Sequence, residues 1–372
     1  MKPRSMRWSA LPALMAIALW CGAGLAQDAA EVPEHDGPYV YWHDSTTATV
    51  FYFCQGKIRE RTFGDVDTLR FHRFCEEEAI EHTITAEPPV IEPTTCIDVP
   101  RIFVVSDIHG EYEALIDLLQ AAGIVDDELR WNWGNGHLVV DGDIFDRGDR
   151  VTETLWLVYR LEQEARMDGG RVHYVLGNHD EMVIHGDNRY INDKYTSGVA
   201  RKSRIRHEDL YGPDMELGRW LRTKPTMLRL NDILFVHAGI SRELVERGLT
   251  IDVVNRKMRE ALEMNSSQIR FSDEPRFLLG SKGPLWYRGM VIDLENRYTR
   301  LTKEEVAAIV EYFGVSSIVV GHTETDQVEQ HYDGLVYTID VPLDELGTLQ
   351  GLLWENDKFY RVTGTGKREG WD

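Results

Sequence analysis

Polar side chains that can bind metal ions follow five apolar segments of this chain. The turns after these segments carry Asp107 and His109, Asp143 and Asp146, Asn178 and His179, His237, and His322. Each turn also contains glycine, and any one of them alone would be an ordinary strand end. Because the carboxyl ends of parallel strands lie at one edge of an open α/β sheet, we expect these side chains to converge there.

The chemical groups in this set match a two-metal site. Carboxylate, amide and imidazole groups offer oxygen and nitrogen ligands without a thiolate, which suits Mn, Fe or Zn, alone or as a mixed pair. Two such ions about 3.5–4 Å apart can hold a phosphoryl group and generate a hydroxide at neutral pH. A carboxylate can bridge them because it has two oxygens. The sequence therefore predicts two divalent or mixed-valence metal ions.

Strands and helices alternate in the part of the chain that positions these residues. An amphipathic helix is expected at 111–122 and a second helix at 151–165. Strands are expected at 101–106, 137–140, 172–176, 226–230, 233–238, 317–322, 335–340 and 348–354. Alternation of this kind predicts an α/β fold with a mostly parallel sheet. The strands at 335–340 and 348–354 are close in sequence, and we expect them to pair as an antiparallel meander.

The motifs resemble those of a known family. D-x-H, G-D-x-x-D-R-G and G-N-H-[D/E], followed by two later histidines, resemble the calcineurin-like metallophosphoesterases, and the unbroken "GDIFDRG" resembles the phosphoprotein phosphatase group. "VVSDIHGEYEAL", "GPLWYRG" and "VGHTETD" are similar to the bacterial Shewanella-like protein phosphatases, over about residues 99–345. The resemblance implies a β-sandwich of mixed sheets flanked by helices, with a catalytic domain at 99–372. Asp180 departs from the phosphoprotein phosphatase pattern, in which Glu is usual.

The resemblance also implies a role for each metal ligand. The implied ligands are Asp107, His109, Asp143, Asn178, His237 and His322. Asp107 and His109 would hold the first ion, and Asp143 would bridge. Asn178 and His237 would hold the second ion, and His322 is a ligand whose ion stays open.

Other residues of the motifs are implied to act on the substrate. His179 would be the general acid that protonates the leaving oxygen, oriented by Asp146. Arg147 and Arg288 would grip the phosphate oxygens, because a guanidinium matches them at two points. Tyr287 would line the entrance. These residues come from motif positions. Asp180 is expected to brace the turn or Arg147, without a part in the chemistry.

The predicted activity is that of a dinuclear-metal phosphomonoesterase acting on phosphoprotein. A metal-bound hydroxide would attack phosphorus, and on the resemblance phosphotyrosine is favoured over phosphoserine. A nucleotide hydrolase of the diadenosine tetraphosphatase type is an alternative, because it shares the core motifs. A non-catalytic metal-binding scaffold is a third, although the ligand and arginine sets are intact.

The first 26 residues are typical of a secretory signal. Three basic residues and no acidic ones precede or flank an apolar run that ends in small residues, so we expect cleavage after Ala26 and no stable membrane insertion afterwards. An uncleaved anchor is the alternative. The protein is thus expected to be exported, and periplasmic or secreted in a bacterium.

Residues 27–98 are expected to form a small β-rich module and linker. Cys54, Cys75 and Cys96 lie there, so one disulfide can form and one thiol is left over. The formal net charge is −21, and −24 without the first 26 residues. An acidic protein repels phosphate backbones, which argues against nucleic acid as a partner and leaves a phosphorylated protein or peptide.

Overall fold

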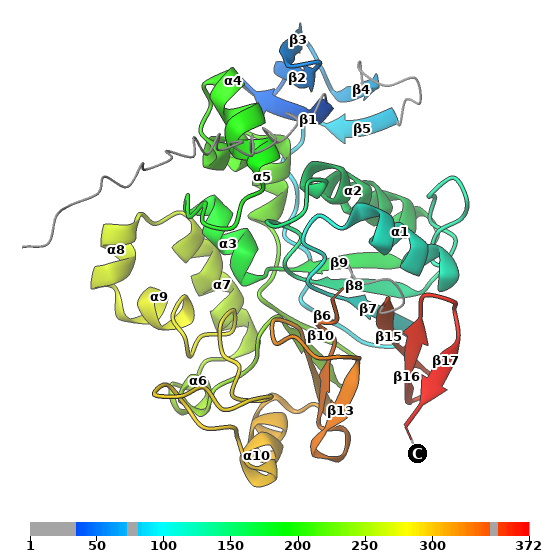
Figure 1. Cartoon of the computed structure of the whole chain (residues 1–372), viewed down its shortest axis with the longest axis vertical. Helices are drawn as coiled ribbons and strands as arrows, with labels where there is room; N and C mark the ends of the chain where they lie inside the picture. The colour runs from blue at the N-terminus through cyan, green and yellow to red at the C-terminus, as the bar shows by residue number, and fades with distance from the viewer. Residues whose placement is uncertain (1–34, 73–80, 343–348, 372) are drawn as a thin grey trace, which may run out of the picture. The chain divides into compact units, whose positions relative to one another are not determined.

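Two six-stranded sheets form the core of the catalytic part in this computed structural model, which describes residues 35–72, 81–342 and 349–371 (Figure 1). The first sheet contains, in spatial order, β17 (Arg368–Gly370), β16 (Lys358–Thr363), β15 (Gln350–Glu355), β7 (Arg101–Val105), β8 (His137–Asp141) and β9 (Arg171–Val175). The second contains β13 (Glu329–His331), β14 (Val336–Thr338), β12 (Ser317–Val320), β11 (Ile233–Val236), β10 (Met227–Leu230) and β6 (Thr95–Cys96).

A hydrophobic cluster joins the two sheets. Val104 and Val139 from the first sheet and Leu228, Phe235 and Val319 from the second all belong to it, and each is at most 1% exposed. Alternate residues of a strand point to opposite faces, so each sheet supplies one face to this cluster. The predicted sandwich of mixed sheets is confirmed.

Strand directions place the predicted ligands at one end of each sheet. β7, β8 and β9 are parallel to one another, and so are β11, β12 and β14. The turns that follow β7, β8 and β9 therefore leave the same edge of the first sheet, and those after β11 and β12 leave the same edge of the second.

The predicted meander of 335–340 with 348–354 is wrong. β14 pairs in parallel with β12, whereas β15 lies in the other sheet, antiparallel to β7 and β16. Leu352 and Leu353 are adjacent in β15, and both are at most 2% exposed. Both faces of β15 are therefore covered, as in an interior strand, and sequence proximity does not determine its partner.

Helices cover the sheets and connect the strands. The two predicted helices are confirmed as α1 (Tyr112–Ala121) and α2 (Val151–Met167), and α1 buries Leu115, Leu118 and Leu119. The others are α3 (Asn178–Ile184), the π-helix η1 (Lys194–Ala200), α4 (Arg201–Ser203), the 3-10 helix η2 (His207–Tyr211), α5 (Glu216–Leu221), α6 (Arg242–Glu246), α7 (Ile251–Leu262), α8 (Ser266–Phe271), α9 (Asp273–Leu278), α10 (Lys303–Phe313) and the 3-10 helix η3 (Tyr332–Gly334).

The N-terminal strands pack on the catalytic part. β1 (His35–Trp42), β2 (Ala48–Cys54) and β3 (Lys57–Phe63) form an antiparallel sheet, and β4 (Thr68–His72) pairs with β5 (Glu81–Thr85). Figure 1 shows β1 beside α5 and α2, and the Trp156 indole of α2 donates to the Pro38 carbonyl of β1 at 2.8 Å. Tyr39 and Val50 share one hydrophobic cluster with Leu155, so these strands have no separate core.

Two cysteines lie in the described part of the chain. Cys54 is disulfide-bonded, and its partner lies outside the described residues; Cys96 is a free thiol. Cys75 and the predicted signal at 1–26 also lie outside them. Within the described residues, no helix is both long and apolar enough to cross a membrane.

Candidate metal centre

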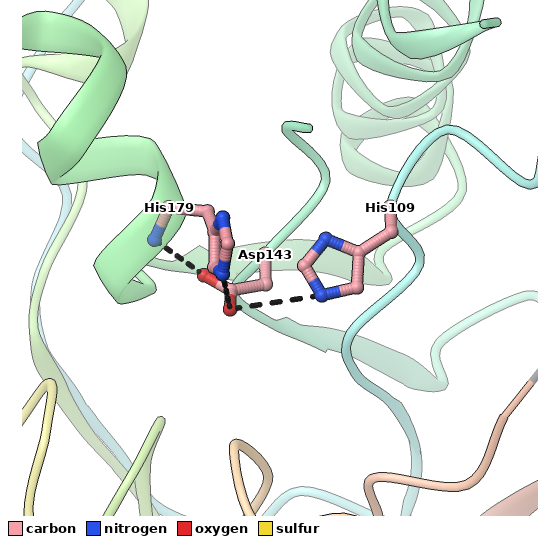
Figure 2. Close-up of side chains that lie close together, drawn as sticks. All are labelled: His109, Asp143 and His179. Carbon is pink, nitrogen blue, oxygen red and sulfur yellow. Dashed lines mark hydrogen bonds and ion pairs between the residues drawn. The ribbon is translucent and has the colours of Figure 1, made fainter. Parts of the chain in front are cut away.

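Asp143 is the central residue of the site. It follows β8 and is 1% exposed. Its Oδ2 lies 3.1 Å from Nε2 of His237 and 4.0 Å from Nε2 of both His109 and His179, and the last two are drawn in Figure 2. Burial opposes ionisation of this carboxyl, but the facing His237 and His179 hold its pKa below the usual range. Asp143 is therefore an ionised carboxylate at neutral pH.

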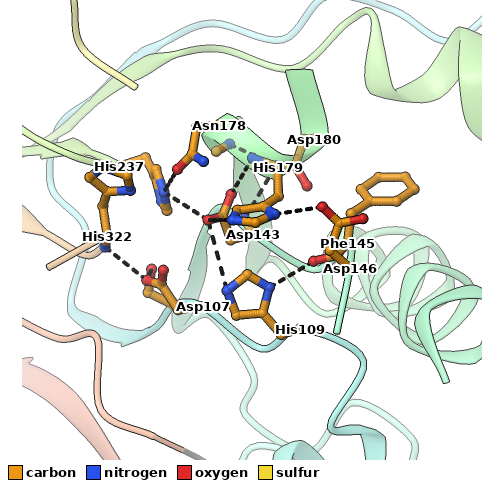
Figure 3. Close-up of polar contacts among 12 residues, drawn as sticks. Asp107, His109, Asp143, Phe145, Asp146, Asn178, His179, Asp180, His237 and His322 are labelled. Carbon is orange, nitrogen blue, oxygen red and sulfur yellow. Dashed lines mark hydrogen bonds and ion pairs between the residues drawn. The ribbon is translucent and has the colours of Figure 1, made fainter. Parts of the chain in front are cut away.

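Two groups of side chains share Asp143 (Figure 3). His109 and His179 form the first group with it, and His237 and His322 form the second. In each group, one ligand atom from every residue lies within 4.8 Å of the others. A carboxylate common to two groups has the arrangement expected of a bridging ligand.

The two remaining predicted ligands lie beside these groups. Oδ2 of Asp107 accepts the backbone N–H of His322 at 3.0 Å, and Oδ1 of Asn178 lies 3.1 Å from Nε2 of His237. The structure thus brings all six predicted ligands together. The ion held by His322 was left open by the sequence, and its side chain lies in one group with His237, which favours the second ion.

The ligand histidines are oriented for metal binding. Nδ1 of His109 donates to the Phe145 carbonyl and Nδ1 of His237 to the Asp141 carbonyl, both at 2.7 Å. Each bond makes Nδ1 a donor, so Nε2 is the nitrogen that faces Asp143 and is available to a metal ion. Nε2 of His322 is buried and has no hydrogen-bond partner among the described residues. These donors and this unpartnered nitrogen fit a pair of divalent ions.

The turns that carry the ligands have strained backbone. Left-handed φ angles occur at Asp107 (52°), His109 (48°), Asp143 (56°), Asp146 (72°), Arg147 (63°) and His322 (61°). Such conformations cost on the order of 1–3 kcal/mol each and concentrate at functional sites. Gly177 is required for a different reason, because a Cβ there would lie 2.0 Å from Oδ1 of Asp143. The G-N-H motif thus needs glycine for close approach to the bridging carboxylate.

His179 differs from the other histidines in its partner. Its Nδ1 lies 2.6 Å from Oδ2 of Asp146, a carboxylate instead of a carbonyl. Burial works against the charged ring, but Asp143 and Asp146 raise the pKa of His179 above its ordinary value. By contrast, burial lowers the pKa of His109, which suits a neutral ligand. The pairing with Asp146 therefore supports a proton donor at His179. Its Nε2 also lies close enough to Asp143 for both residues to contact one metal ion.

The two predicted arginines lie beside the ligands. Arg288 donates from Nη1 to the carbonyl of His322. Arg147 is exposed, and within the described residues its guanidinium has no ion-pair partner. Its positive charge lowers the pKa of His179, against the effect of the two carboxylates. A free guanidinium at the mouth of the site can bind an anion.

Tyr287 does not line the entrance as predicted. It is 3% exposed, and its ring packs against Tyr298 at 4.7 Å in the cluster beneath α10. The preceding residue, Trp286, stands against the ligand His322 with ring centroids 5.7 Å apart. The motif "GPLWYRG" thus predicted a segment near the site, but Trp286 and not Tyr287 is the residue whose ring contacts His322.

Tyr190 is a second aromatic residue at the site, and no sequence motif marks it. Its ring is 50% exposed and lies 5.3 Å from the ring of His179. Its carbonyl accepts the backbone N–H of Arg147 at 2.9 Å. The residue follows α3 in a loop without a motif, so only the folded chain brings it to the site.

Asp180 braces the turn and does not contact Arg147 among the described residues. Its Oδ2 accepts the N–H of Gly177 at 2.6 Å and that of Asp143 at 3.3 Å. Burial first, and then the charge of Asp143, raise the pKa of Asp180 to about 6. The first of the two expected roles is therefore the one that the geometry supports.

A family model agrees with the arrangement. Residues 100–325 match the calcineurin-like phosphoesterases. The chain is 27% identical to Shewanella-like protein phosphatase 1 of Plasmodium berghei over 243 residues, which cover 64% of this chain and 66% of that protein. It is 30% identical to a symmetrical bis(5'-nucleosyl)-tetraphosphatase of Methylococcus capsulatus, over 37% of this chain and 43% of that one.

A solved structure matches over more of the chain. The cold-active protein-tyrosine phosphatase of a psychrophilic Shewanella species is 34% identical, with a TM-score of 0.85. The match covers 91% of this chain and 100% of the other. The similarity therefore extends beyond residues 100–372 into the part of the chain that precedes them.

Proposed function

This chain belongs to the calcineurin-like phosphoesterases, and we propose that within this family of hydrolases it is a protein phosphatase that acts on phosphotyrosine. The observation that carries the proposal is the 34% identity over 91% of the chain to a protein-tyrosine phosphatase. The relatives named as Shewanella-like protein phosphatases support the same substrate class.

The residues of the site can be given roles in phosphomonoester hydrolysis. We assign six ligands to a metal pair: Asp107, His109, Asp143, Asn178, His237 and His322. When bound, the two ions would supply positive charge to the phosphate oxygens and an activated water. Arg147 and Arg288 would bind the phosphate. His179 would give its Nε2 proton to the leaving oxygen, while Asp146 on Nδ1 keeps the ring oriented.

Two aromatic side chains support phosphotyrosine over phosphoserine. Tyr190 lies against the proposed general acid, and Trp286 lies against a ligand of the second ion. A phosphotyrosyl ring bound between them would make ring contacts worth about 0.5–1.5 kcal/mol each. A phosphoseryl side chain has no ring to place there.

A dinucleotide tetraphosphatase is the second candidate function. A relative with that activity in its name is 30% identical, so the shared core motifs fit it as well. Its match covers only 37% of this chain, compared with 91% for the tyrosine phosphatase structure. The longer match favours the protein substrate.

The test compares substrates on one preparation. Metal-stripped protein, with Mn²⁺ restored, is assayed on two peptides that differ only in phosphotyrosine or phosphoserine, and on diadenosine tetraphosphate. We expect the highest kcat/KM with phosphotyrosine. Tyr190→Ala should lower that value roughly threefold to tenfold and leave the phosphoserine value nearly unchanged, because only the ring contact is lost.

Tyr312→Ala is the matched control. Tyr312 is 39% exposed on α10 and contacts Phe313, so its loss should change neither substrate. Equal loss on both peptides in Tyr190→Ala would reject the ring contact. Cleavage of the dinucleotide alone would reject the protein phosphatase assignment, and no turnover of any substrate by metal-loaded protein would favour a scaffold.

A further inference from the structure

The loop that carries Asp146 and Arg147 is bound along its length by a second segment, residues 190–195. The backbone N–H of Arg147 donates to the Tyr190 carbonyl at 2.9 Å, and Asn192 Nδ2 donates to the Arg147 carbonyl at 2.8 Å. The hydroxyl of Tyr195 accepts the backbone N–H of Val151 at 2.9 Å. Both backbone groups of Arg147 are thus held from one side.

Lys194 adds a charged contact to the same loop. Its Nζ donates to the Asp149 carbonyl at 2.5 Å, and its side chain is 5% exposed. The ammonium also lies 3.2 Å from Asp36 and 3.6 Å from Glu153. Burying a lone ammonium is costly, and the two carboxylates offset that cost in this position.

Asp36 connects this contact to the N-terminal strands. It lies on β1 and its side chain is 1% exposed. The Tyr39 hydroxyl donates to its other carboxylate oxygen and lies 3.3 Å from Thr152 at the start of α2. A continuous series of contacts therefore runs from β1 through Lys194 to the backbone of the loop.

The held loop has a conformation that needs support. Arg147 has a φ of 63°, in the left-handed region, and Asp146 has a φ of 72°. A bulky residue keeps such an angle only when surrounding contacts fix it. Within the described residues, the guanidinium of Arg147 has no ion-pair partner that could fix it instead.

We propose that Lys194 is a positioning residue: pinned by Asp36 of β1, it holds the loop so that Arg147 faces the phosphate. The N-terminal strands then contribute to anion binding without touching the anion. This inference rests on the proposed role of Arg147 in the phosphatase site, and it assigns a function to β1.

A double-mutant cycle tests the proposal. The affinity of Mn²⁺-loaded protein for inorganic phosphate is measured by calorimetry in wild type, Lys194→Met, Arg147→Ala and the double variant. We expect Lys194→Met to raise Kd about tenfold in the wild-type background and less than about twofold in the Arg147→Ala background, because it acts through Arg147. Equal factors in both backgrounds would overturn the proposal.

Lys224→Met is the matched control, because it also removes one buried ammonium. Lys224 is likewise buried and paired, with Glu162 at 2.6 Å, but it contacts no part of residues 146–151 in the described structure. It should lower stability without raising the Kd for phosphate. A rise equal to that of Lys194→Met would show that general destabilisation is the cause, and would overturn the proposal.

A second variant covers the case in which Lys194→Met does not fold. Asn192→Ala removes a half-buried side chain and its bond to the Arg147 carbonyl. It should raise Kd only when Arg147 is present, and it should speed amide exchange at Arg147 in metal-free protein. Unchanged exchange and affinity would contradict the proposal. A wild type that binds no phosphate would reject the phosphatase assignment itself, together with this inference.

Discussion

Buried histidines occur both around Asp143 and away from it in this molecule, and their surroundings differ. His109, His179, His237 and His322 lie around Asp143, each in the segment that follows a strand. His137 and His207 are buried elsewhere, and His173 is half-buried. His137 and His173 face each other at 3.0 Å, and His207 lies among the rings of Tyr195 and Tyr211.

The comparison shows that neither burial nor the direction of the pKa shift marks a functional histidine. Burial lowers the pKa of His109 at the site and also that of His207 away from it, to about 4 for the latter. At His109, His179 and His237 the distinguishing feature is the shared Asp143 carboxylate near Nε2 together with a fixed partner on Nδ1. Metal ligation and proton transfer need both, and packing needs neither.

The largest expected effect is that of the shared carboxylate. Asp143→Asn removes the bridging charge, so we expect loss of bound metal and a fall in kcat/KM of at least about 10³-fold. Metal content by mass spectrometry and phosphatase assays measure both. Asp117→Asn, on the exposed face of α1, is the control and should change neither. Retained metal and activity in Asp143→Asn would show that the histidines do not depend on this carboxylate.

Asp146→Asn should have an intermediate effect confined to one histidine. We expect kcat to fall roughly 10²-fold, with metal content unchanged, because the proposed general acid loses its orienting partner. Asp146 raises the pKa of His179, so its loss lowers that pKa and the protonated ring titrates away at lower pH. The alkaline limb of the kcat profile should therefore move to lower pH. A limb that stays in place would contradict the assignment of His179.

The smallest effect on activity is expected at His207, a buried histidine away from the metal centre. The pKa of His207 is lowered to about 4 by burial, from an ordinary 6.5. Between these values the unfolded chain binds more protons, so stability is full above about 6.5 and falls as pH drops towards 4. In metal-stripped protein this contributes about 2–3 kcal/mol between pH about 7.5 and 4.5.

His207→Phe measures that contribution. The variant should lose less stability than wild type over the same pH range in urea unfolding, and its activity at neutral pH should be unchanged. A pH dependence equal to that of wild type would mean that other groups cause it.

The sequence was sufficient for the parts of the site that are encoded locally. Each strand and the turn that follows it form one continuous stretch, so the ligands Asp107, Asn178 and His237 could be predicted from apolar runs and glycines. The rest depends on contacts between distant segments. Tyr190 reaches the site only because its loop binds Arg147, and the burial of His207 depends on the surrounding rings.

The same limit applies to the sheets. The partners of β14 and β15 are decided by which faces are covered after folding, and that information is not present in either segment. The burial of Tyr287 in the cluster beneath α10 is likewise set by packing between distant segments, so its distance from the entrance could not be predicted from its own segment.

The predicted ligands come from both sheets, and this has a consequence for how the site forms during folding. The bond from His322 to Asp107 closes 215 residues of chain, from the turn after β7 to the turn after β12. A loop of that length closes only at a considerable loss of chain entropy, which the packing of both sheets must offset. A chain still being synthesised lacks His322 until most of the catalytic part has been made. The complete ligand set therefore requires that both sheets are packed together.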